Sequence, residues 1–195
     1  MTINLEQLKA AIQAKGYTWF ETGDYNLNII GIRNASTGNK VTNLFDDWIA
    51  CAYKVNGEWQ LHYWEATTDP GKMGVEQYHN PQGVARLVEG QYGKSHVIGL
   101  HQGKYEALCQ IAPLPVYRDA NRDLVFDKTK ITTGVYGINI HKAGVESWLV
   151  ENWSEGCQVF KRAAEFNQFM LLCKEAVKRY GNKFTYTLIN SEDLS

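Results

Sequence analysis

Apolar residues recur at helical spacing in two segments of the chain. The first covers residues 4–15, where Asn4 is placed to cap a helix and Gly16 to end it. The second predicts a helix over about residues 158–180 with one buried face. The apolar stripe of the first helix is Leu5, Leu8 and Ile12, and that of the second is Val159, Ala163, Phe166, Met170, Cys173 and Val177.

Between these helices the pattern changes to short segments that are rich in β-branched and aromatic residues. Turn signals such as Asn56-Gly57 and Asn80-Pro81 separate them. This succession is typical of a mostly antiparallel sheet, barrel or sandwich. The predicted strands are residues 27–32, 48–55, 59–65, 84–88, 95–100, 107–111, 114–117, 133–140 and, after the long helix, 184–189.

The pattern therefore predicts a mainly β fold with flanking helices (α+β), in a single domain over residues 1–195. An N-terminal helix occupies residues 1–16, and a β-rich core runs from about 25 to 157. The long helix follows over 158–180, and the last strand over 184–189. With 195 residues the chain has the length of one ordinary domain, and it can bury a sufficient hydrophobic core without a disulfide or a structural metal.

Composition narrows the function classes. The 20 basic and 21 acidic residues give a net charge of −1, so the chain lacks the positive field on which non-specific nucleic-acid binding depends. No apolar run approaches the ~20 residues of a membrane span, and the N-terminus does not read as a secretory signal. We expect no nucleic-acid partner, no membrane span and synthesis in the cytoplasm without a signal peptide. The oligomeric state stays open.

The four cysteines form no CxxC pair, and a disulfide scaffold is not expected in a chain of this size. Cys51 and Cys109 lie in apolar predicted strands, and Cys173 lies on the buried stripe of the long helix. We assign these three to the core, where a free cysteine behaves as a small hydrophobe. Cys157 differs because it lies in a polar, glycine-containing loop, residues 153–158.

Cys157 lies directly before the predicted long helix, with Ser154 placed as its N-cap. The unpaired N–H groups and the positive end of the helix dipole would favour the thiolate, which is the nucleophilic form. Gly156 would let a substrate approach the backbone, and the N–H groups of Gly156 and Cys157 could hold a developing oxyanion. The alternative is a loop cysteine without a chemical role.

A cysteine nucleophile usually needs an imidazole as its base. His141 ends a predicted strand shortly before the cysteine loop, so it could meet Cys157 at one rim of the sheet. His101 also lies at a strand end and could line the same cleft. The other histidines are assigned a structural or solvated role: these are His62, His79 and His96.

His141 followed by Ser154-Glu155-Gly156-Cys157 resembles the catalytic signature of the L,D-transpeptidase (YkuD-like) family. In that family a histidine at a strand end precedes a Ser/Thr-x-Gly-Cys motif by a similar interval. Residues 134–160, together with 117–123, are also similar to a group of uncharacterised phage and bacterial proteins. The resemblance implies a YkuD-like fold around a cysteine acyl-transfer site.

Three positions depart from the family pattern. Lys142 stands where glycine or serine usually follows the histidine, and Glu155 where the family has a second histidine. Val159 stands two places after the cysteine, where the family tends to have an arginine that is expected to hold substrate. Arg118 or Arg33 could take that role.

The resemblance implies acyl transfer on peptidoglycan stem peptides, without a cofactor. Cys157 would attack the carbonyl of an L-centre residue that is followed by a D-amino acid. His141 would take the thiol proton and return it to the leaving amine, and His101, Asp119 or a backbone carbonyl would orient the imidazole. Transfer of the acyl group to an amine makes a cross-link, whereas transfer to water hydrolyses the peptide.

We expect hydrolysis, as in a phage-lysin-like L,D-peptidase, because the chain begins without an export signal and resembles phage-encoded proteins. The site of action would be the bacterial cell wall or periplasm, with delivery by a phage as one route. An L,D-transpeptidase that forms cross-links is the alternative.

One acidic loop carries oxygen ligands at a spacing similar to that of an EF-hand. The glycine and the final glutamate of such a loop are replaced by Leu124 and Lys130, and a hairpin turn held by Asp and Asn side chains is the commoner origin. We therefore expect no metal. The oxygen ligands are Asp119, Asn121, Asp123 and Asp127.

The chain also carries 6 Trp and 11 Tyr, and sheet packing explains most of them. Trp148 and Trp153 flank the proposed site and would also suit a groove for sugar or peptide. A rival hypothesis is a non-catalytic module of the same fold that binds wall glycan or serves as a virion component. The departures at Lys142, Glu155 and Val159 would then mark lost catalysis.

Overall fold

The computed structural model describes residues 2–77 and 80–194, so His79 lies outside the described residues. The elements are α1 Leu5–Ala14, β1 Asn28–Arg33, η1 Ala35–Thr37, β2 Asp47–Val55, β3 Glu58–Thr67, α2 Lys72–Gln77, β4 Val84–Leu87, β5 Gly90–His101, β6 Tyr105–Gln110, β7 Leu114–Asp119, β8 Ile131–Gly134, β9 Ile140–Lys142, β10 Gln158–Phe160, α3 Ala163–Tyr180, β11 Phe184–Asn190 and η2 Ser191–Leu194.

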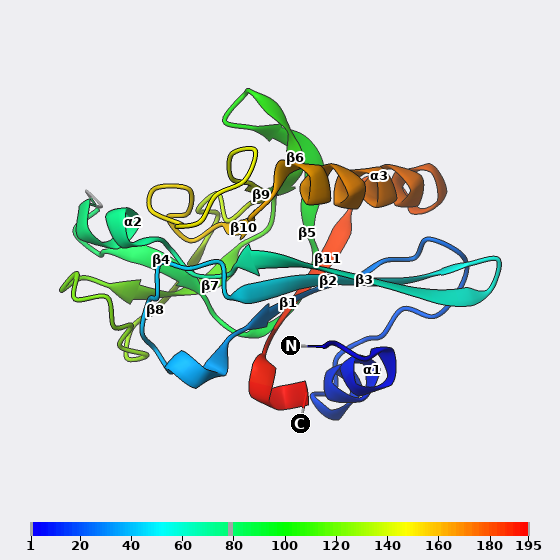
Figure 1. Cartoon of the computed structure of the whole chain (residues 1–195), viewed down its shortest axis with the longest axis horizontal. Coiled ribbons are helices and arrows are strands. Elements are labelled where there is room, and N and C mark those ends of the chain that lie inside the picture. The colour runs from blue at the N-terminus through cyan, green and yellow to red at the C-terminus, as the bar shows by residue number, and fades with distance from the viewer. Residues whose placement is uncertain (1, 78–79, 195) are drawn as a thin grey trace.

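Most of the strands close into a barrel with the order β1-β11-β5-β6-β9-β10-β3-β2, and β4, β7 and β8 form a smaller second sheet. The pairs β1–β11 and β9–β10 are parallel, whereas the other pairs in the barrel are antiparallel. In Figure 1, α3 lies above the barrel strands and α1 below them. The prediction of a mainly β single domain with flanking helices is confirmed, in its barrel form.

The N-terminal helix forms as its local sequence predicts. The side chain of Asn4 accepts hydrogen bonds from the backbone N–H groups of Glu6 and Gln7, and Gly16 follows the helix with φ +71°. Leu8 and Ile12 are buried against the outer face of β1, β2 and β11. Of the described residues, no helix combines the length and the apolar character that crossing a membrane requires.

The long helix begins later than the periodicity predicts. Residues 158–160 form strand β10, which pairs with β3 on one side and β9 on the other, and the helix starts at Ala163. The misassignment has a physical cause: Val159 is buried in the strand and happens to fall in phase with the apolar stripe of the helix. The prediction of one strand over 133–140 is also wrong, since β8 ends at Gly134 and β9 begins at Ile140.

The helix α3 covers the main core of the barrel with one face. Phe166, Phe169, Met170, Cys173 and Ala176 are buried there. Three residues of the predicted stripe, Phe166, Met170 and Cys173, are therefore buried in the helix as expected. Cys51 belongs to the same core. Cys109 is half-buried, and burial raises the pKa of its thiol.

A buried group of charged side chains, here called the arginine cluster, joins the barrel to the second sheet. It consists of Arg33, Asp69, Arg86 and Glu89. Asp69 Oδ1 lies 2.9 Å from Arg33 Nε and 2.7 Å from Arg86 Nε, and Arg33 Nη1 lies 3.2 Å from Glu89 Oε1. Burial alone would raise the pKa of Asp69, but the two guanidinium groups hold that pKa below its ordinary value. Arg33 is therefore a structural residue, and its predicted role in substrate binding is wrong.

Candidate active site

Cys157 and His141 line one cavity of about 730 Å³, here called the cysteine cavity. Its walls come from the turn between β5 and β6, the segment before β9, β9 itself and the loop before β10. The lining residues are His101, Gln102, Lys104, Tyr105, Tyr136, Gly137, Ile138, Asn139, His141, Asn152, Trp153, Glu155 and Cys157. The structure thus brings together four of the candidate site residues, His101, His141, Trp153 and Cys157, with Glu155, one of the departures from the family pattern.

The parallel pairing of β9 and β10 places the two reactive side chains. In this pairing Val159 lies opposite His141, and Gln158 lies opposite Ile140. Side chains alternate along a strand and paired residues share a face, so Cys157, two positions before Val159, is on the same side as His141. Parallel neighbours need a long crossover connection, which here is residues 143–157.

His141 is held in the tautomer that a general base requires. Its Nδ1 lies 2.9 Å from the backbone oxygen of Lys142, and because a carbonyl can only accept, Nδ1 must carry the proton. Nε2 then keeps its lone pair. The Tyr105 hydroxyl donates to the same carbonyl at 3.2 Å. Of the three predicted orienting groups, the structure supports the backbone carbonyl.

The imidazole of His141 is neutral at ordinary pH. The residue is only 3% exposed. Burial, with a smaller contribution from the charge of His101, lowers the pKa of His141 to about 4. His141 can therefore accept a proton at neutral pH but does not hold one at rest.

His101 contacts His141 by stacking. The ring centroids are 4.0 Å apart and the planes differ by 19°. Nδ1 of His101 accepts a hydrogen bond from Asn139 Nδ2 at 3.0 Å, and burial, followed by the charge of Lys104, lowers the pKa of His101. His101 thus packs against the face of the His141 imidazole.

The thiol of Cys157 is protonated at rest, contrary to the sequence-based prediction. Burial raises its pKa to about 11, the backbone N–H of Asn139 opposes that shift, and the charge of Glu155 adds to it. The Sγ donates to the carbonyl of Gly137 at 3.2 Å. The predicted help from a helix dipole is missing because α3 begins only at Ala163, after β10.

Ser154 and Gly156 shape the turn that carries the cysteine. Ser154 Oγ accepts from the Gly156 N–H at 3.1 Å and donates to the Cys157 carbonyl at 2.8 Å. Gly156 has φ +122°, and a Cβ there would lie 2.6 Å from the Ala85 carbonyl oxygen, so only glycine fits. Ser154 is therefore not a helix N-cap, and the Gly156 N–H is already engaged rather than available to an oxyanion.

Two other candidates lie outside the cysteine cavity. Arg118 donates to the carbonyl of Gly83 at 3.1 Å and to Thr132 Oγ1 at 3.1 Å. Its guanidinium carbon lies 4.5 Å from the ring centroid of Tyr136, which lines the cavity, so Arg118 supports a wall from outside and does not line the cavity itself. Asp119 lies on β7 of the second sheet. These predicted contacts with substrate or imidazole are wrong.

The remaining candidates divide by exposure. The Lys142 side chain lines a neighbouring pocket, while its carbonyl orients His141. Trp153 is 42% exposed and lines the cysteine cavity. Trp148 is 74% exposed outside that cavity, with Lys161 Nζ 4.9 Å from its ring centroid.

The acidic loop is built as a turn. Asp119 accepts from the N–H of Arg122, and Asp123 accepts from the N–H of Val125 at 2.9 Å. The Asn121 side chain donates to Asp123 at 2.9 Å. Over residues 2–77 and 80–194, no group of three or more His, Cys, Asp or Glu side chains is arranged to hold a metal ion.

Sequence reasoning missed two residues that support the dyad. Asn139 links the elements of the site: its side chain donates to His101 and accepts from the Gln110 N–H at 2.9 Å. Its position two residues before His141 on the same strand face is a signal that could have found it. Tyr105, which lies 3.3 Å from His141 Nδ1 through its hydroxyl, follows the His101 turn in sequence.

No protein-family model, curated protein or solved structure matches the chain. What the site can do therefore follows from its own geometry. It presents a neutral thiol and a neutral imidazole, on neighbouring strands, to a cavity large enough for a peptide segment.

Proposed function

We propose that this protein is a cysteine-dependent acyl-transfer enzyme of YkuD-like fold that hydrolyses peptidoglycan stem peptides. One observation carries the proposal: Cys157 and His141 face the same cavity, and the Lys142 carbonyl fixes the imidazole as a base. The resemblance of the His141 and Ser154–Cys157 motifs to the L,D-transpeptidase signature supplies the substrate class. The proposed site of action is the bacterial cell wall.

The protonation states favour general-base attack over a preformed ion pair. His141 Nε2 takes the thiol proton as Cys157 Sγ bonds to the carbonyl carbon of the L-centre residue. The tetrahedral intermediate collapses when His141 returns that proton to the leaving amine and the C–N bond breaks. Water, deprotonated by His141, then attacks the thioester, which releases the acid and restores the thiol.

Hydrolysis is the proposed outcome because it needs only water, and no second peptide has to bind in the cysteine cavity. Cross-linking requires an amine acceptor that displaces water from the same position. The two outcomes share the acyl-enzyme, so the products alone separate them.

The test is incubation with a purified disaccharide tetrapeptide from cell wall, followed by mass spectrometry. The expected product is the disaccharide tripeptide with release of the D-residue. Cys157→Ala and His141→Ala should each lower the rate by at least about 10³-fold, whereas Cys109→Ala should retain it. Equal cleavage by Cys157→Ala, or no product from the unmodified protein, would contradict the proposal, and dimeric products would show transpeptidation.

A non-catalytic wall-binding module is the second candidate. The raised pKa of Cys157, the engaged Gly156 N–H and the 74% exposed ring of Trp148 favour it. This candidate predicts that the protein sediments with purified cell walls, that Trp148→Ala releases it, and that no peptide is cleaved.

A further inference from the structure

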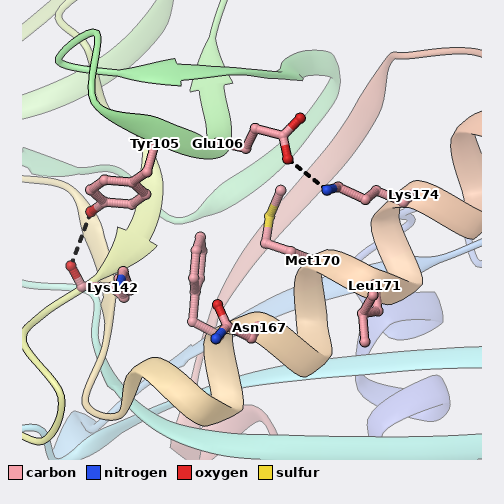
Figure 2. A pocket seen from close by; sticks show the side chains of 8 residues that line it. Tyr105, Glu106, Lys142, Asn167, Met170, Leu171 and Lys174 are labelled. Carbon is pink, nitrogen blue, oxygen red and sulfur yellow. Dashed lines mark hydrogen bonds and ion pairs between the residues drawn. The ribbon is translucent and has the colours of Figure 1, made fainter.

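A second pocket, of about 370 Å³, lies on the other side of Tyr105 from the cysteine cavity. We call it the helix pocket because α3 forms one of its walls, as Figure 2 shows. It lies between Tyr105, Glu106 and Lys142 on one side and Phe166, Met170 and Lys174 on the other.

The helix pocket has an apolar base and a charged rim. Phe166 and Met170 are almost fully buried at 2% and 6% exposure, and Leu171 beside them is 65% exposed. At the rim, Lys174 Nζ pairs with Glu106 Oε2 at 2.6 Å, drawn as a dashed line in Figure 2. These two charges compensate each other.

Lys142 leaves a positive charge in this pocket without a counterion. Its Nζ lies 5.3 Å from the ring centroid of Tyr105. Within the described part of the chain, Lys142 forms no ion pair with a carboxylate. An ammonium group beside an apolar surface is complementary to a ligand that carries a carboxylate next to a small apolar group.

Tyr105 connects the helix pocket to the dyad. It lines both pockets, and its hydroxyl donates to the Lys142 carbonyl that orients His141. Lys142 follows His141 directly, so successive side chains of β9 face the two pockets. A peptide held at the dyad therefore has the helix pocket within reach across Tyr105.

We propose that the helix pocket is a subsite of this enzyme that binds a carboxylate of the stem peptide. The ammonium of Lys142 pairs with the carboxylate, and Met170 and Leu171 contact the adjoining apolar group. This inference rests on the proposed function. A stem peptide with lysine at its third position offers such a carboxylate in two places, at the C-terminal D-residue and on the γ-linked glutamate.

Binding to the inactive Cys157→Ala protein tests the subsite separately from catalysis. The probe is the synthetic peptide L-Ala-γ-D-Glu-L-Lys-D-Ala, measured by isothermal titration calorimetry. Adding Lys142→Gln should weaken binding about tenfold, since charged hydrogen-bonded pairs contribute on that scale. Lys178→Gln is the matched control, because it removes the same charge from the end of α3, outside the pocket, and should leave the affinity unchanged.

Two amidated peptides identify the carboxylate. One carries a C-terminal amide and the other an amide on the glutamate. The peptide whose amide replaces the recognised carboxylate should bind the Cys157→Ala protein about tenfold more weakly than the parent peptide. Adding Lys142→Gln should not weaken the binding of that peptide further. The other amide should respond to Lys142→Gln as the parent peptide does.

Leu171→Glu is a second test of the helix pocket, which does not depend on whether Lys142→Gln folds correctly. Leu171 is largely exposed, so the variant should fold, and its new carboxylate should weaken binding of the parent peptide. Equal affinity in Lys142→Gln and Lys178→Gln, or no binding of any peptide, overturns the subsite. Binding that depends on Lys142 without cleavage by the unmodified protein refutes the proposed function and leaves the subsite in place.

Discussion

The arginine cluster and the cysteine cavity both bury polar side chains, but the buried side chains are charged and paired in the cluster and neutral in the cavity. In the arginine cluster each charged side chain forms an ion pair with an oppositely charged side chain of a neighbouring segment. Arg33 Nη1 also donates a hydrogen bond to the Leu87 carbonyl at 2.9 Å. In the cysteine cavity the buried groups are neutral, and burial lowers the pKa of His141 while it raises that of Cys157.

This difference in charge state distinguishes residues that stabilise the fold from residues that can interact with a ligand. Charges that satisfy one another inside the protein have no capacity left for a ligand. His141 donates from one ring nitrogen to the Lys142 carbonyl, and its other ring nitrogen keeps a lone pair that can accept a proton. Arginine residues in the sequence therefore say less about substrate than neutral groups that line a cavity.

The largest expected effect is on stability. Arg33→Met preserves much of the side-chain volume but leaves Asp69 and Glu89 without their shared partner, which should cost about 3–5 kcal/mol of unfolding free energy. Cys157→Ala, in the cavity, should change it by less than about 1 kcal/mol. Urea denaturation measures both, and similar losses in the two variants would erase the distinction.

The next effect is the pH dependence of stability. The folded pKa of His141 is about 4, below its ordinary value, so the unfolded chain binds the proton first as the pH falls. Stability should therefore decrease from about pH 6.5 to pH 4, by on the order of 3 kcal/mol for this group. Burial lowers the pKa of His96 to about 4 as well, and its contribution should be similar. Asp69, whose folded pKa is depressed, loses its contribution only at lower pH.

Urea midpoints between pH 4 and pH 7 test this assignment. Burial raises the pKa of Asp47 to about 7, so this carboxyl changes stability with the opposite sign in the same window. The comparison is therefore between variants: His141→Gln should lose on the order of 3 kcal/mol less stability between pH 7 and pH 4 than the unmodified protein. An unchanged slope in His141→Gln would mean that the imidazole is charged in the folded protein.

The smallest effect is on thiol reactivity. With a pKa of about 11, Cys157 should hold up to about a hundredfold less thiolate at pH 7 than an ordinary cysteine. Its alkylation by iodoacetamide should be slow and should accelerate up to about pH 11. Mass spectrometry with Cys157→Ser as the control identifies the modified residue. Rapid labelling with an inflection near pH 6 would instead indicate a thiolate–imidazolium pair.

Local signals predicted the parts of the molecule that depend on neighbours in sequence. The cap at Asn4 and the strand that carries Cys51 followed from residues within one element. The junction at residues 158–162 failed because strand and helix share an apolar phase, and pairing with β3 and β9 decides between them. That pairing is a contact between distant segments.

The sequence predicted that His141 and Cys157 come together but not the electrostatics around them. His141 and Cys157 stand out by type and position. The group that orients the His141 imidazole could not be predicted because it is a backbone carbonyl, which every residue has. The stacking of His101 on His141 could not be predicted either, because it depends on β5 and β9 both pairing with β6. The prediction of a lowered thiol pKa was wrong because it assumed that a helix begins next to Cys157. Residues 158–160 instead form strand β10 of the barrel, and α3 begins at Ala163.

The crossover between β9 and β10 has an evolutionary consequence. Strand pairing sets the spacing of sulfur and imidazole, whereas residues 143–157 only have to return the chain to the start of the next strand. That connection contributes Asn152, Trp153 and Glu155 to the cavity wall. Insertions and exchanges there would remodel the wall of the cysteine cavity while the sulfur and the imidazole keep their places, so the ligand that fits the cavity can change without rebuilding the barrel.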